Sequence, residues 1–197
     1  IHNQTAEEYS RRYDSIESEE DLAFLNAFLS PVTPGSRIVD LGCGTGYSTG
    51  YFTRKGMIAE GVDLSSGMIA VAKRNYPNLS FIHEDMRTYE PKQHVDAVWA
   101  GYSLFHLEQK DFEKTLEKIR SYLKPGGIFG LVMQEGEGEL DADEPLLPGE
   151  KIYVHLYTEG EIKDLLEKHL FTVIEQKRKE PMYEMEFPYN KLLVIAK

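Results

Sequence analysis

Acidic side chains and glycines with the spacing of a ligand-binding loop gather in the first quarter of the chain. Asp40 ends an apolar run, and Gly42, Gly44 and Gly46 follow it at alternate positions. Because glycine lacks a Cβ, such a loop lets the main chain approach a ligand closely and adopt otherwise strained angles. The helix expected after the loop would point its free N–H groups at the same place. In an open α/β sheet, this place is the carboxyl ends of the strands, where ligands bind.

A second and a third acidic residue follow the next two expected strands. Asp63 ends the second strand, where a carboxylate can accept hydrogen bonds from ribose hydroxyls. Asp85 follows the third strand, with Met86 beside it. The loop departs from the dinucleotide fingerprint Gly-x-Gly-x-x-Gly, because Tyr47 occupies the position of the third glycine and would obstruct close helix–strand packing there. The spacing therefore disfavours a nicotinamide dinucleotide site.

Five motifs succeed one another over about residues 36 to 133. They are Val39-Asp40-Leu41-Gly42-Cys43-Gly44-Thr45-Gly46, Gly61-Val62-Asp63-Leu64-Ser65, Glu84-Asp85-Met86, Val95-Asp96-Ala97-Val98 and Leu123-Lys124-Pro125-Gly126-Gly127. In order and spacing they resemble the motifs of class I S-adenosylmethionine-dependent methyltransferases of the small-molecule type, and five in register are far more specific than one. The resemblance implies an α/β, Rossmann-like fold. Its sheet would have seven strands, mostly parallel, with helices on both faces and the last strand antiparallel.

The resemblance also implies S-adenosyl-L-methionine as cofactor and assigns residues to it. The loop that would hold the methionine part, with the first residue near its ammonium, consists of Asp40, Gly42, Cys43, Gly44 and Gly46. Asp63 would bind the two ribose hydroxyls, and Asp85 the adenine amino group. Leu64 and Met86 would enclose the adenine ring, and Gly101-Tyr102-Ser103 would face the cofactor and the substrate.

Three further features have both a functional and a structural interpretation. His106 follows the fourth strand and would be a general base, since imidazole titrates near neutrality, or a structural histidine in a Phe-His-Leu segment. Tyr9 and Tyr13 share one helical face and would form a lid beside a cationic sulfur, or pack on the sheet. Cys43 lacks the partners of a nucleophilic cysteine, so we expect it to fill space in the loop.

The elements that must position these residues alternate between strand-like and helix-like runs, as in a parallel α/β sheet. We expect a single domain over residues 1–197. Its parts are a helical cap (1–33), a cofactor-binding core (36–133), a candidate substrate-cap insertion (135–157), and a C-terminal helix and strand hairpin (158–197). Six of the ten residues 135–144 are acidic, which is equally typical of a solvated loop. Residues 124–127 are expected to form a turn before the fifth strand.

Length and charge exclude several classes of protein. A chain of 197 residues can bury a core without a disulfide or a metal. The net charge of -11 disfavours binding to nucleic acid or to an anionic membrane. A single cysteine favours a reducing compartment, no apolar run approaches the roughly 20 residues of a membrane span, and the histidines lack metal spacing. We therefore expect a cytoplasmic protein without a membrane or metal partner.

These features favour a methyltransferase that moves a methyl group to an oxygen, nitrogen or other nucleophile of a small molecule by in-line displacement. Two other classes stay open. One is a non-catalytic S-adenosylmethionine-binding protein that kept the fold, and the other is an NAD-dependent oxidoreductase, which the glycine spacing disfavours. The charge argues against RNA as the acceptor, although an acidic face would suit a basic protein tail.

Overall fold

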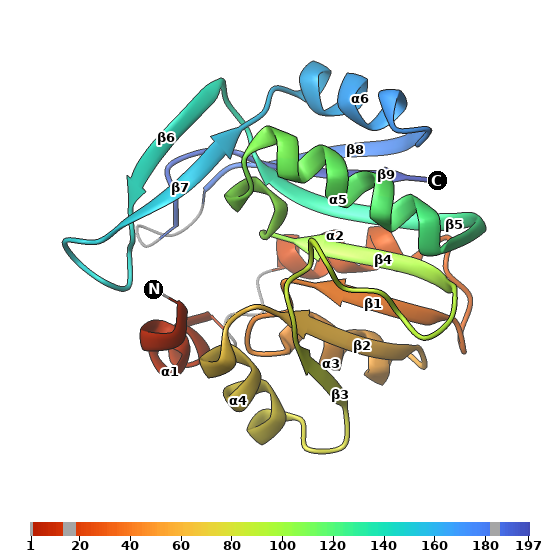
Figure 1. Cartoon of the computed structure of the whole chain (residues 1–197), viewed down its shortest axis with the longest axis horizontal. Coiled ribbons are helices and arrows are strands. Elements are labelled where there is room, and N and C mark those ends of the chain that lie inside the picture. The colour runs from red at the N-terminus through yellow and green to blue at the C-terminus, as the bar shows by residue number, and fades with distance from the viewer. Residues whose placement is uncertain (1, 14–18, 182–185) are drawn as a thin grey trace.

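The computed structural model describes residues 2–13, 19–181 and 186–197, and a seven-stranded sheet forms its centre (Figure 1). The strands, in sheet order, are β3 Ser80–His83, β2 Ile58–Asp63, β1 Arg37–Leu41, β4 Val95–Gly101, β5 Leu123–Gln134, β9 Lys191–Ala196 and β8 Val173–Lys179. Neighbours from β3 to β5 pair in parallel, whereas β9 is antiparallel to both β5 and β8. The predicted Rossmann-like sheet with its last strand antiparallel is confirmed.

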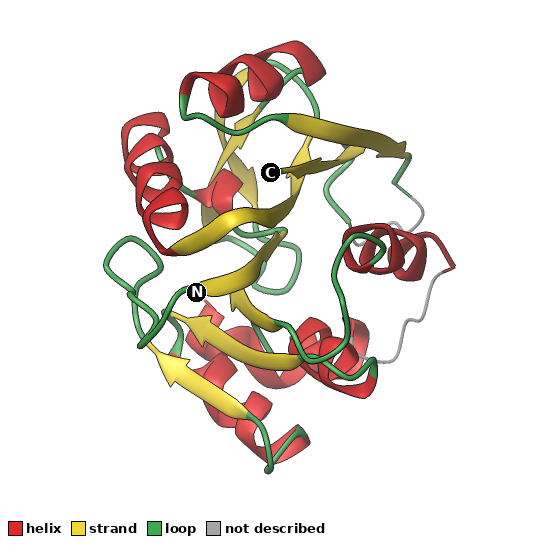
Figure 2. Ribbon diagram, turned by 90° about the vertical axis from the view of Figure 1, so that its right-hand side faces the viewer, coloured by secondary structure: helices red, strands yellow, loops and turns green. Residues whose placement is uncertain are grey.

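Helices cover both faces of this sheet (Figure 2). They are α1 His2–Tyr13, α2 Glu19–Leu29, α3 Tyr47–Arg54, α4 Ser66–Asn75, α5 Gln109–Tyr122, α6 Glu159–Lys168 and the short 3-10 helix η1 Leu104–His106. On one face, Phe112 of α5 and Leu166 of α6 belong to the main core. On the other, Phe28 of α2 and Phe52 of α3 pack around Trp99 of β4. Trp99 is therefore a core residue, as its place in an apolar strand predicts.

The strand order places the loops after β1 and β4 at one edge of the sheet. β1 lies between β2 and β4, so the chain builds outward from β1 in one direction and from β4 in the other. Ligands of open α/β sheets bind at such a point, beyond the carboxyl ends of the strands. Gly42 follows β1 and Tyr102 follows β4, so both lie at this carboxyl edge.

Residues 135–157 form a β-hairpin, and the solvated-loop interpretation of their acidic half is wrong. β6 Gly138–Asp143 pairs antiparallel with β7 Lys151–Leu156, and Figure 1 shows the hairpin at the left of the sheet, on the same side as α1. Ala142 and Val154 are buried, whereas Glu139 and Asp141 are exposed. The acids thus occupy the solvent side of a strand, and the described chain has two strands more than the seven predicted.

The segment Lys124-Pro125-Gly126-Gly127 differs from the predicted turn, because it belongs to β5. The pairing with β4 shifts register between Val95 and Ala97, and Gly126 has a left-handed φ of 74°. A strand that carries such an irregularity can still pair at both of its ends. The motif is therefore the irregular first part of a strand.

Candidate active site

The glycine loop after β1 holds left-handed backbone at all three glycines. The backbone φ values are 72° at Gly42, 53° at Gly44 and 89° at Gly46, and residues with a Cβ rarely adopt such values. A Cβ at Gly42 would lie 2.3 Å from the Cβ of Ser103, and one at Gly46 would meet the ring of Phe81 at 2.7 Å. A Cβ at Gly44 would meet nothing within 4 Å. Gly44 is therefore the glycine of this loop beside which a ligand has room.

Asp63 joins the ends of the first two strands. Its Oδ2 accepts a hydrogen bond from the Gly44 N–H at 2.9 Å, and its Oδ1 accepts one from the Ser65 N–H at 2.8 Å. The neighbouring Leu64 is apolar yet 58% exposed. A half-buried carboxylate beside an exposed apolar side chain is an arrangement that can bind hydroxyls and a flat ring together.

Asp40 lies beneath the loop, with only 1% of its surface exposed. Its Oδ2 accepts hydrogen bonds from Ser48 Oγ at 2.7 Å and from Thr49 Oγ1 at 2.6 Å, so it ties β1 to the first turn of α3. Burial raises the pKa of Asp40 to about 6, and the two hydroxyl donors oppose that rise. The structure thus places Asp40 as a support of the loop, and its predicted contact with a ligand's ammonium stays a prediction.

Cys43 is buried between two glycines of the loop. Burial, together with the charges of Asp40 and Asp63, raises the pKa of its thiol well above the usual value. A protonated, inaccessible thiol is a poor nucleophile, in agreement with the space-filling interpretation. Its Sγ also lies 2.8 Å from where a Cβ of Gly61 would be, so a glycine is needed on the adjacent strand.

Asp85 is held by an arginine that the sequence interpretation missed. Both of its carboxylate oxygens accept hydrogen bonds from the Arg87 guanidinium, at 2.6 to 3.0 Å, and the main-chain N–H of Arg87 donates to Oδ1. Arg87 also reaches Asp111 of α5 at 2.9 Å. The guanidinium lowers the pKa of Asp85. The adjacent Met86 is partly buried in the main core.

The segment after β4 turns back against the glycine loop. Tyr102 has a φ of 59°, uncommon for a residue with a side chain, and its Oη donates to Asp21 of α2 at 3.0 Å. Ser103 Oγ donates to the Leu41 carbonyl at 2.8 Å. The space in which a Cβ of Gly101 would lie is filled by the Trp99 indole, so that glycine accommodates a core residue.

His106 lies in η1, against the β6–β7 hairpin. Its Nδ1 is 2.9 Å from the main-chain oxygen of Tyr153 in β7. A carbonyl oxygen only accepts hydrogen bonds, so Nδ1 carries a proton, and in the neutral form of the ring the lone pair is on Nε2. The ring also packs against Phe105, at a centroid distance of 4.3 Å. This fixed tautomer is the one that a base acting through Nε2 requires.

Helix α1 packs on α4, next to the loop that follows Asp63. Asn3 Oδ1 accepts hydrogen bonds from Ser65 Oγ at 2.8 Å and from the Gly67 N–H at 2.9 Å, at the start of α4. Farther along, Arg74 makes a two-pronged ion pair with Glu7. These bonds hold α1 against α4.

The two tyrosines predicted on α1 have different outcomes. Tyr9 packs against the buried cluster of Ala6, Met68 and Val71, where α1 meets α4. This contact is an apolar one with a helix and not with the sheet. The side chain of Tyr13 lies outside the described residues, so the lid interpretation stays a prediction.

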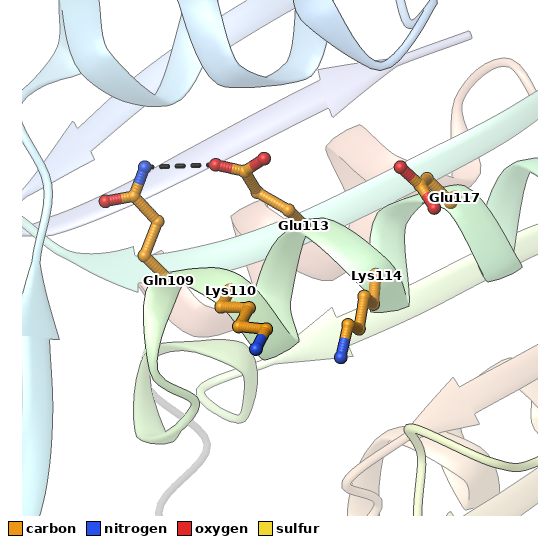
Figure 3. Close-up of a pocket in the computed structure, with 5 residues that line it drawn as sticks. All are labelled: Gln109, Lys110, Glu113, Lys114 and Glu117. Atoms are coloured by element: carbon orange, nitrogen blue, oxygen red, sulfur yellow. Dashed lines mark hydrogen bonds between the residues drawn. The ribbon is translucent and has the colours of Figure 1, made fainter.

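A surface hollow lies on α5 (Figure 3). It is lined by Gln109, Lys110, Glu113, Lys114 and Glu117. Gln109 Nε2 donates to Glu113 Oε1 at 3.1 Å, and acids and bases alternate around it. Such a pattern is typical of a solvated helix face, and we assign no site to it.

The described part of the chain lacks a metal-ligand cluster and a membrane-spanning helix. Its residues include no group of three or more His, Cys, Asp or Glu that could hold a metal ion. None of its helices combines the length and the apolar character that crossing a bilayer requires.

Comparison with known sequences agrees with this geometry. Residues 38–127 match the family described as "Methyltransferase domain". Trans-aconitate 2-methyltransferase of Escherichia fergusonii is 34% identical over 100 residues, which are 50% of this chain and 39% of that protein. An uncharacterized methyltransferase of Synechocystis sp. is 31% identical over 104 residues, 51% of this chain and 48% of that protein. The chain thus aligns with less than half the length of these curated relatives.

Comparison with solved structures concerns the fold. The Burkholderia thailandensis 1,6-didemethyltoxoflavin-N1-methyltransferase, solved with 1,6-didemethyltoxoflavin and S-adenosylhomocysteine, superposes with a TM-score of 0.77 at 18% identity, covering 99% of this chain and 85% of that one. A S-adenosylmethionine-dependent methyltransferase from Clostridium acetobutylicum gives 0.76 at 16% identity, covering 100% and 98%.

A glycine loop after β1 and an acid at the end of β2, at the carboxyl edge of an open sheet, define a Rossmann-like nucleotide- or nucleoside-binding domain. Residues 38–127, which contain this loop and this acid, match the methyltransferase domain family, and the chain has the fold of S-adenosylmethionine-dependent methyltransferases of known structure.

Proposed function

We propose that this chain transfers a methyl group from S-adenosylmethionine to a small molecule. The observation that carries the proposal is the pairing of Gly44 with Asp63. Open space beside Gly44 meets the Asp63 carboxylate, which keeps lone pairs for ligand hydroxyls because each of its oxygens accepts one main-chain N–H. The names of the matched relatives and of the structural neighbours support the same reaction class.

The residues present fit this cofactor. Asp63 would bind the ribose hydroxyls, and the exposed Leu64 would lie against the adenine ring. Gly44 would admit the methionine part, with Asp40 supporting the loop from below. Asp85 would reach the adenine amino group only together with Arg87, which already occupies both of its oxygens.

When bound, S-adenosylmethionine would supply a methyl group that is activated by a positively charged sulfur. The acceptor's nucleophile would attack this methyl carbon in line with the sulfur, and S-adenosylhomocysteine, neutral at sulfur, would leave. The protein contributes orientation and exclusion of water. His106 would accept the proton that the acceptor loses, through Nε2. Tyr9 on α1, Tyr102 and the β6–β7 hairpin would border the acceptor.

The same proposal extends to partners and compartment. A net charge of -11 suits a small molecule better than a nucleic acid. The lone Cys43 is free and buried, which suits a reducing compartment such as the cytoplasm.

Calorimetry with S-adenosylhomocysteine tests the proposal. We expect saturable binding to the wild-type protein and at least tenfold weaker binding to Asp63→Ala. Glu60→Ala, in the same strand, is the matched control, because Glu60 bonds to Ser80 and Tyr89 and does not contact the loop. Absence of binding at millimolar ligand, or equal affinity in wild type and Asp63→Ala, would contradict the proposal. If the wild-type protein binds as expected, a panel of small acceptors would be used to measure methyl transfer.

A further inference from the structure

Beside the proposed cofactor site, a row of buried polar side chains crosses three strands at the carboxyl edge of the sheet. Gln134 ends β5, Lys191 begins β9 and Lys179 ends β8. In the sheet register Gln134 pairs with Lys191, and Lys191 pairs with Lys179. Directly paired residues of antiparallel strands point to the same face, so all three side chains lie on one face of the sheet.

This row is buried, although its strands are otherwise apolar. Gln134 and Lys191 are each 3% exposed and Lys179 is 6% exposed. The residues that follow Lys191 in β9 are Leu192, Leu193, Val194, Ile195 and Ala196. Buried ions are costly, and well-packed apolar residues of similar volume often serve stability equally well. Stability alone does not require the polar residues of this row. Because they lie only at the carboxyl edge, where ligands of such sheets bind, they indicate a ligand-binding role.

Three further residues complete the row, and we call the six together the edge cluster. Lys179 Nζ donates to Asp21 Oδ1 at 2.7 Å, and the Tyr102 hydroxyl donates to the same oxygen. Lys191 Nζ pairs with Glu186 at 3.3 Å. The edge cluster is Asp21, Tyr102, Gln134, Lys179, Glu186 and Lys191. It contains two ammonium groups and two carboxylates, so it is balanced in charge.

The edge cluster is continuous with the glycine loop. Ser103, the residue after Tyr102, lies where a Cβ of Gly42 would be. The Tyr102 hydroxyl bonds to Asp21, and burial together with the charges of Asp21 and Glu186 raises the Tyr102 pKa. A molecule seated on this cluster would therefore lie next to a cofactor held by the loop.

Two buried oxygens of the edge cluster have no hydrogen bond within the described residues, and one of them, Glu186 Oε2, still faces the Lys191 ammonium at 3.3 Å. Gln134 Oε1 is buried and has no hydrogen bond to any residue that the structure describes. The Lys191 ammonium does not supply one, because it donates to the main-chain oxygens of Phe187 at 2.8 Å and Tyr189 at 2.6 Å and faces Glu186 at 3.3 Å. A buried acceptor without a donor is destabilising, and a donor on a ligand would relieve that cost.

We propose that the edge cluster binds the methyl acceptor, and that the acceptor is an uncharged molecule that donates an N–H or O–H hydrogen bond to Gln134 Oε1. The proposal rests on the proposed function and specifies its substrate class. An uncharged acceptor leaves the buried charges balanced, whereas an ion would add an uncompensated charge.

Paired fragments test this class by ligand-observed NMR titration at saturating S-adenosylhomocysteine. Uracil, phenol and glutarimide donate a hydrogen bond, and 1,3-dimethyluracil, anisole and N-methylglutarimide do not. We expect at least one donor fragment to bind at least fivefold more tightly than its methylated counterpart. Gln134→Leu should abolish this preference, and the exposed Gln109→Leu should retain it. Equal binding within all pairs, no binding of any fragment, or an unchanged preference in Gln134→Leu would overturn the proposal.

A second variant covers the case in which Gln134→Leu does not fold. Glu186→Gln keeps the size of the side chain and leaves the edge cluster with one excess positive charge. The wild type should prefer uracil to anionic orotate, and Glu186→Gln should reduce that preference at least fivefold, whereas the exposed Glu180→Gln should not. An unchanged preference in Glu186→Gln would overturn the proposal. Calorimetry separates the two claims: loss of S-adenosylhomocysteine binding contradicts the proposed function, whereas normal binding without fragment selectivity contradicts the edge cluster alone.

Discussion

The Asp63 carboxylate accepts a hydrogen bond from the Gly44 N–H at 2.9 Å, and so connects the end of β2 to the loop after β1. The bond fixes the loop at the one glycine whose Cβ direction is open. Rigid placement of a ligand-contacting loop by a neighbouring strand is how a binding geometry is kept before the ligand arrives. The loop glycines therefore have different roles, although the sequence spaces them evenly.

Alanine substitutions should separate these roles. Gly44→Ala adds left-handed strain of about 1–2 kcal/mol and places a methyl group in ligand space, so we expect at least tenfold weaker S-adenosylhomocysteine binding. Gly42→Ala should destabilise the fold more, because its methyl group would overlap Ser103. Gly35→Ala is the control, with φ 86° and open space, in the turn before β1. Urea denaturation and calorimetry measure both quantities. Equal binding losses in Gly44→Ala and Gly35→Ala would contradict the assignment.

Asp40 should make stability depend on pH. Its pKa is about 6 in the folded protein and 3.8 in the unfolded chain, so the folded state binds the proton more tightly. The contribution of Asp40 to the unfolding free energy should therefore be full below about pH 4, fall by up to about 3 kcal/mol as the pH rises to 6, and stay level above that. Asp40→Asn should remove this decline in urea midpoints between pH 4 and 8. Asp85→Asn is the control of opposite sign, since the pKa of Asp85 is lowered and its contribution is lost as the pH falls. Identical pH profiles for wild type and Asp40→Asn would disprove the account.

Arg87 should influence recognition of the adenine base more than stability. The Arg87 side chain is exposed, and exposed ion pairs such as the one it forms with Asp85 contribute about 0–1 kcal/mol to the free energy of unfolding. Without it, Asp85 loses the guanidinium that orients both of its oxygens. We expect Arg87→Ala to lower the preference for S-adenosylhomocysteine over its 6-oxo analogue severalfold in calorimetric titrations. Arg178→Ala, which breaks a surface pair with Glu135, should leave the preference unchanged. A preference that survives in Arg87→Ala would mean that Arg87 is not needed to recognise the amino group.

The sequence predicts those parts of the site whose chemistry is local. The glycine loop and Asp63 are recognisable because consecutive residues must form a tight turn after a buried strand. The edge cluster depends instead on the register of β5, β9 and β8, and its Lys179–Asp21 pair spans 158 residues. No periodicity within one segment reports such a contact. The seven strands of the sheet were likewise predictable from apolar runs, whereas acids on the solvent side of β6 concealed the hairpin.

Two substitutions should distinguish a role of His106 as general base from a role in holding the β6–β7 hairpin. His106→Asn keeps a nitrogen donor near Nδ1 for the Tyr153 carbonyl but has no atom in place of Nε2. If Nε2 is the base, turnover should fall at least about 100-fold with an acceptor that loses a proton. The acidic limb of the kcat/KM profile should disappear, while S-adenosylhomocysteine affinity and Tm stay near wild type. His106→Phe, which also removes the donor, should lower Tm as well. Wild-type turnover in His106→Asn, with a lowered Tm in His106→Phe, would instead assign His106 to holding the β6–β7 hairpin against η1.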